Sequence, residues 1–131
     1  MPKKKPYEIS LLTEWMNRLG LQEWSIALET GCAPGDMAIP GTMGCTSWEE
    51  STKTAAIQIV DPERLDRGRL VRDFDFEEVL VHELLHLKTC LLSSTNEEEN
   101  LNDRVLHQII DDLARAMVAI KKENRTKESD K

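Results

Sequence analysis

Residues 75–91 constrain the fold more than any other stretch, because they specify a helix that is apolar on nearly every side. Asp75, followed three residues later by Glu78, makes a capping box, and this predicts a helix that begins at Phe76. Leucine and valine recur along the segment at one-turn spacing and also fill much of the remaining surface. We therefore expect other elements of the domain to bury this helix on most sides.

Within this helix, burial is costly for three polar residues: His82, Glu83 and His86. Residues i and i+4 share a helix face, so both imidazoles can bind one metal ion while Glu83 projects beside them. A catalytic zinc site has three protein ligands and an open position for water, whose proton a nearby carboxylate can take. The pattern predicts a zinc hydrolase with Glu83 as general base. The competing interpretation is a chance spacing of polar residues on an ordinary core helix.

Length and composition indicate a single domain. A chain of 131 residues can bury a sizeable core without disulfides, and we expect one domain over 1–131 with tails at 1–6 and 123–131. The three cysteines have no paired spacing, which argues against an extracellular disulfide framework. With no signal peptide and no membrane-spanning segment in view, we expect a soluble cytoplasmic protein. Cys90 lies one turn beyond His86, but a packed thiol is the expected role.

The charge balance restricts the partners. The chain has 17 basic and 24 acidic residues, a net charge of −7, and part of the negative charge is concentrated in Glu97, Glu98 and Glu99. Phosphate binding depends on clustered lysine and arginine, so we expect no nucleic-acid partner. Because no segment could span a membrane, we also expect no membrane partner. The oligomeric state stays open.

Hydrophobic periodicity gives the order of the elements. A first helix, capped by Ser10 or a neighbour, is predicted to end near Leu19, and alternation around Trp24, Ile26 and Leu28 predicts a strand. Two further strands are predicted at about 44–48 and 54–60, joined as a hairpin. The last helix is predicted to end near Lys122, and its core stripe to consist of Leu106, Ile110, Leu113, Met117 and Ile120.

This order predicts an α+β fold with an N-terminal helix, a small antiparallel sheet, the motif helix and a C-terminal helix. With the segment 81–87 (VHELLHL), the chain resembles the small gluzincin-type zincins of phages and prophages, and more distantly the SprT-like and ImmA/IrrE-like groups. The resemblance implies a zinc metallopeptidase whose sheet lies over the motif helix. It also implies that the hairpin edge between 44 and 60 pairs with an extended peptide or protein substrate.

The third ligand departs from the gluzincin pattern. A metzincin is excluded, because Thr89 and Leu92 stand where that group has glycine and histidine. The segment 107–114 resembles the third-ligand helix of the phage kinds with His107 in place of glutamate, and three imidazoles also bind zinc. The chain has only three histidines, and Asp111 could accept a hydrogen bond from the His107 ring. The alternatives are a half-buried surface histidine at 107, or a ligand from 97–99.

Several roles stay open at the level of sequence. Arg104 is a candidate for stabilising an oxyanion, although a pairing with 97–99 competes with that role, and the single tyrosine, Tyr7, precedes the expected first helix. The three tryptophans are expected to pack in the core or hairpin rather than to stack on substrate. The alternative functions are a non-catalytic, zinc-stabilised protein-binding module and hydrolysis of a small non-peptide substrate.

Overall fold

The computed structural model describes residues 6–39, 42–64, 74–90 and 101–129, with the side chains of the last helix described over 104–125. The fold class is α+β, as predicted. The helices and strands are α1 (Pro6–Leu19), β1 (Ser25–Cys32), β2 (Gly44–Glu49), β3 (Thr54–Val60), α2 (Phe76–Lys88) and α3 (Leu101–Ser129), and the 3-10 turns are η1 (Pro34–Asp36) and η2 (Pro62–Arg64).

The sheet is mixed, which corrects the prediction of an antiparallel sheet. Its strand order is β1-β3-β2. The predicted hairpin is present, because β2 and β3 pair antiparallel with Gly44 opposite Ile59 and Glu49 opposite Thr54. However, β3 lies between its hairpin partner and β1, and it pairs parallel with β1, Ser25 standing opposite Thr54. β2 is therefore an edge strand of this sheet.

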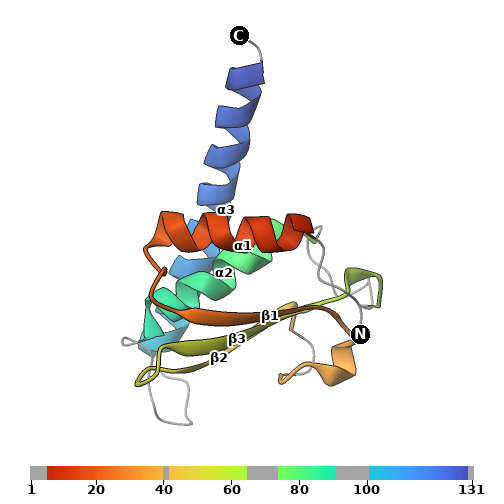
Figure 1. Ribbon diagram of the computed structural model, residues 1–131, viewed down its shortest axis with the longest axis vertical. Helices are drawn as coiled ribbons and strands as arrows, with labels where there is room; N and C mark the ends of the chain where they lie inside the picture. Colours follow the sequence, from red (N-terminus) through yellow and green to blue (C-terminus); the bar gives the residue numbers. More distant parts are fainter. Residues whose placement is uncertain (1–5, 40–41, 65–73, 91–100, 130–131) are drawn as a thin grey trace.

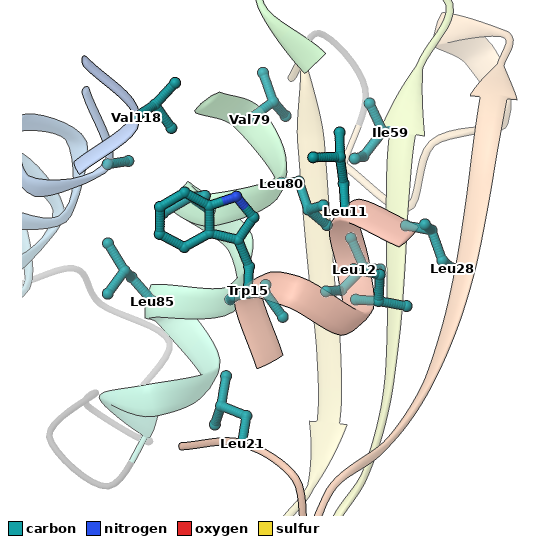
Figure 2. Close-up of a cluster of buried hydrophobic side chains, with 14 of the residues drawn as sticks. Leu11, Leu12, Trp15, Leu21, Leu28, Ile59, Val79, Leu80, Leu85 and Val118 are labelled. Carbon is teal, nitrogen blue, oxygen red and sulfur yellow. The ribbon is translucent and has the colours of Figure 1, made fainter. Parts of the chain in front are cut away.

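The helices lie on one side of the sheet, and the C-terminal part of α3 extends away from it (Figure 1). α2 contacts α1, α3, β2 and β3, so it is the central helix of the domain. Leu80, Val81 and Leu84 of α2 are fully buried, as the apolar composition predicts. Figure 2 shows that side chains of all layers meet in one core cluster, including Trp15 of α1, Leu28 of β1, Leu80 of α2 and Val118 of α3.

The two helix starts differ in how well they were predicted. α2 begins at Phe76 as expected, and the Asp75 carboxylate accepts a hydrogen bond of 3.1 Å from the backbone N–H of Glu78. The predicted cap at Ser10 is wrong, because α1 already begins at Pro6 and Ser10 lies inside it. Proline suits a first helical position, since its missing N–H has no partner there in any helix.

The buried face of α3 differs from the predicted stripe. Ile110 is buried, but Leu113 and Ile120 are 46% and 56% exposed, so their assignment to the core is wrong. The buried residues after Ile110 are Ala114, Val118 and Lys121, one position further along the helix. Ala114 and Val118 belong to the main core cluster, and Lys121 forms an ion pair with a buried carboxylate. The helix also continues past the predicted end at Lys122 to Ser129.

That carboxylate belongs to Glu77, which joins three helices in a buried polar network. Trp15 Nε1 of α1 donates a hydrogen bond of 2.6 Å to Glu77 Oε2 of α2, and Lys121 Nζ of α3 forms an ion pair with the same oxygen. Lys121 Nζ also lies 3.1 Å from Glu14 Oε1 of α1. Buried charges need such partners, so the network restricts how α3 can sit on α1 and α2.

Within the described residues, no helix is both long enough and apolar enough to cross a membrane.

Candidate metal centre

Three imidazoles converge where α2 packs against α3. His82 and His86 lie one turn apart on α2, and His107 comes from the second turn of α3. One ring nitrogen of each lies within 4.8 Å of the other two, and these three residues form a group that could hold a metal ion. The Nε2 atoms of His82 and His86 are 3.0 Å apart. His107 is exposed, so the group reaches the surface on the α3 side.

Asp111 holds one of these rings in place. Its Oδ1 lies 3.2 Å from Nδ1 of His82. The expected partner of Asp111 was His107, so the structure assigns this carboxylate to a different ring of the group. An acceptor at Nδ1 favours the tautomer with the proton on that nitrogen, which leaves Nε2 available as a ligand atom. Arg115 adds a weaker contact, with Nη2 3.6 Å from Asp111 Oδ2.

The protonation of His86 suits a metal ligand. Burial lowers the pKa of His86 to about 4, and repulsion from His82 and His107 adds to the effect. Its ring is therefore neutral at pH 7, as a metal-binding imidazole must be. A group of three close imidazoles that includes a neutral ring fits zinc, which binds nitrogen donors with tetrahedral geometry.

Glu83 is buried on α2 and faces the edge strand. The residue is only 5% exposed, and its Oε1 accepts a hydrogen bond of 2.6 Å from the Thr46 hydroxyl of β2. Burial raises the pKa of Glu83 to about 7, although the hydrogen bond from Thr46 acts in the opposite direction. A carboxyl group with this pKa can both accept and return a proton near neutral pH.

Sequence reasoning missed Thr46 and its neighbour Gly44. The strand itself was predicted, and alternation along it puts Gly44 and Thr46 on one face. The sequence does not specify how β2 is placed against α2, and this placement brings the face with Gly44 and Thr46 onto Glu83.

Other residues singled out in the sequence are not members of the group. Cys90 is buried and is not part of a disulfide, as expected for a packed cysteine, and it is not a member of the histidine group. Arg104 and Tyr7 are exposed. The competing ligands at 97–99, and any pairing of Arg104 with them, fall outside the described residues.

The tryptophans divide between packing and exposure. Trp15 is buried and Trp24 packs against the main core, as predicted. Trp48 lies on β2 of the hairpin, opposite Ala55, and is 38% exposed.

Comparisons with protein-family models, curated proteins and solved structures find no match. The function must therefore be inferred from the site itself. Three imidazoles there could hold a metal ion, and α2, which carries two of them, also carries the buried carboxyl group of Glu83.

Proposed function

We propose that the protein is a zinc-dependent metallopeptidase in which His82, His86 and His107 hold the metal and Glu83 is the general base. The observation that carries the proposal is the convergence of three imidazoles, two from α2 and one from α3, together with a buried glutamate on α2. Structural zinc sites usually have four protein ligands and catalytic ones three. The group has three members within the described part of the chain, which supports the catalytic kind.

Bound there, zinc would supply Lewis acidity, lowering the pKa of water and polarising a carbonyl group. The residues of the chain provide the proton chemistry. Glu83, with a pKa of about 7, is divided between its charged and neutral forms at pH 7. It can take a proton at a carboxylate oxygen as the nucleophile forms and pass it to the nitrogen of the leaving amine. Glu83 is not a member of the ligand group, so these two roles fall on different side chains.

The sheet supports a peptide as the substrate. β2 is an edge strand that pairs with β3 on one side, and its residue Thr46 contacts Glu83. An extended peptide can pair with the backbone of an exposed strand edge, and here that edge runs past the proposed general base. A peptide held in this way would have its backbone carbonyls close to the site. A small non-peptide substrate would make no use of this edge.

The proposal is tested in two steps. Protein purified without added metal is dialysed and its metal content measured, with about one equivalent of zinc expected. It is then incubated with a mixture of unstructured peptides, and the products are identified by mass spectrometry with and without a chelator. Chelator-sensitive cleavage supports a metallopeptidase. Bound zinc without cleavage of any peptide would instead indicate a zinc-stabilised binding module, and absence of any first-row metal would contradict the metal site itself.

A further inference from the structure

We propose that β2 positions the Glu83 carboxylate, with Thr46 as the positioning residue and Gly44 providing the space in which the carboxylate lies. This inference rests on the proposed function, because it gives the edge strand a part in the reaction beyond any pairing with a substrate. It concerns the orientation of Glu83 and involves no additional ligand or group.

Thr46 holds one oxygen of the carboxylate. Its hydroxyl Oγ1 lies 2.6 Å from Glu83 Oε1 and 3.4 Å from the backbone oxygen of Glu83. The short contact is a hydrogen bond to a carboxylate oxygen, which is stronger than one between neutral groups. Thr46 itself is held by the sheet, where it stands opposite Ile57. The orientation of Glu83 is thus tied to the strand as well as to its own helix.

Gly44 leaves room for the other oxygen. A Cβ atom at this position would lie 2.9 Å from Glu83 Oε2 and 3.0 Å from Cγ1 of Val79. Both distances are shorter than an ordinary van der Waals contact. Because Oε2 is at the end of a flexible side chain, an added methyl group would displace the carboxylate more easily than it would displace the strand. Glycine at 44 therefore keeps Oε2 where the structure places it.

Thr46 and Gly44 act on different oxygens of the carboxylate, Oε1 and Oε2, from the same face of β2. Of the two carboxylate oxygens, Oε1 accepts the hydrogen bond from Thr46, and Oε2 lies against the space left at Gly44. Misplacing a catalytic group by about 1 Å can lower a rate by about a hundredfold. A strand that restrains both oxygens should therefore affect turnover more than substrate binding.

The first test compares Thr46→Val with Thr46→Ser, using a peptide that the parent protein cleaves. Valine keeps the shape of threonine and removes the hydroxyl, whereas serine keeps the hydroxyl. We expect Thr46→Val to lower kcat by about ten- to a hundredfold, with KM changed by less than about twofold and zinc content unchanged. Thr46→Ser should restore most of the rate. Full activity of Thr46→Val, or a loss confined to KM, would overturn the proposal.

Gly44→Ala is the complementary variant, with Gly35→Ala as its control. A Cβ at Gly35 meets nothing within 4 Å, so that variant should keep the parent kcat. Gly44→Ala should lower kcat by at least about tenfold while retaining zinc and a cooperative unfolding transition. Equal rates for the two alanine variants would contradict the role of Gly44.

A double-mutant cycle tests the contact without any need for activity. The melting temperature is measured for the metal-free parent, Thr46→Val, Glu83→Met and the double variant. If the hydroxyl holds the carboxylate, Thr46→Val should lower the melting temperature by about 3 to 6 °C in the parent but by about 1 °C in the Glu83→Met background. Equal shifts in both backgrounds overturn the positioning inference. A coupled pair in a protein that cleaves no peptide supports the positioning of Glu83 and contradicts the metallopeptidase proposal alone.

Discussion

Nδ1 of His82 lies 3.2 Å from Oδ1 of Asp111, so a carboxylate on α3 orients an imidazole on α2. The same helix supplies His107 to the group. The site thus depends on how the two helices pack. His82 and His86 of α2 and His107 and Asp111 of α3 link that packing to metal binding. Loss of the Asp111 carboxylate should therefore change metal affinity even though Asp111 is not a member of the ligand group.

Asp111→Ala should weaken zinc binding by about ten- to a hundredfold, the usual cost of losing the partner of a metal-bound histidine. The ring of His82 would lose the acceptor that favours its ligating tautomer. Affinity is measured by competition with a chromophoric chelator at constant pH. The control is Asp112→Ala, which removes an exposed carboxylate one residue away and should leave affinity within about twofold. If the two variants bind zinc equally well, Asp111 does not orient the site.

His107→Ala should weaken zinc binding by more than about a hundredfold, because a lost ligand costs more than a lost partner of a ligand. The same competition assay applies, with Glu98→Ala and Glu99→Ala as comparisons from the acidic run. A loss of about tenfold or less for His107→Ala, beside a larger loss for either glutamate variant, would move the third ligand to 97–99.

Glu83→Gln should retain zinc and fold but lower the hydrolysis rate by about two to four orders of magnitude, as expected when a general base is removed. Glutamine keeps the length of the side chain and can still accept a hydrogen bond from Thr46. Metal content and the circular dichroism spectrum serve as controls on the same sample. Retention of the parent rate would falsify the assignment of Glu83 as the base.

Lys121→Met should destabilise the protein by about 3 to 5 kcal/mol, because it leaves the buried carboxylate of Glu77 without its ion-pair partner. Urea unfolding at pH 7 measures the change. The double variant Lys121→Met with Glu77→Leu removes both charges and should recover much of the loss, although Trp15 Nε1 then lacks its acceptor. If the single variant is as stable as the parent, the buried ion pair does not form in solution.

Asp75 should give α2 a stabilising contact that depends on pH. Burial raises the pKa of Asp75, but hydrogen bonds from Lys122 and the Glu78 backbone outweigh it and hold the pKa below the usual 3.8. A lowered pKa in the folded state means that the charged form stabilises the protein above about pH 4. That stabilisation is lost as the pH falls through the folded-state pKa.

The variants Asp75→Asn and Asp75→Ala separate the charge from the cap. Asparagine still caps the helix, so Asp75→Asn should cost less than about 1 kcal/mol at pH 7, since Lys122 is largely exposed. Asp75→Ala also removes the helix cap, so it should lower the free energy of unfolding by about 0.5 to 2 kcal/mol more than Asp75→Asn does. Urea midpoints at pH 7 and pH 3 provide the measurement. If the difference in urea midpoint between the parent and Asp75→Asn is as large at pH 3 as at pH 7, the charge of Asp75 is not its source.

Local sequence patterns predicted α2 and the hairpin well. The capping box at Asp75 and Glu78 marks the start of α2, and spacing along the helix puts His82 and His86 on one face. Alternation gives β3 its observed bounds and β2 its bounds to within one residue. These features depend on residues within one or two turns of each other, so they can be predicted without the rest of the fold.

The sequence by itself thus determined the α+β class, the position of the motif helix and the presence of a third histidine on the next helix. Only the tertiary structure decided that β1 pairs parallel with β3, that Leu113 turns outward while Lys121 is buried, and that Asp111 contacts His82 rather than His107. It also decided that Thr46 meets Glu83. Strand order, helix rotation and strand-to-helix register depend on contacts between residues far apart in the chain, and local periodicity does not specify them.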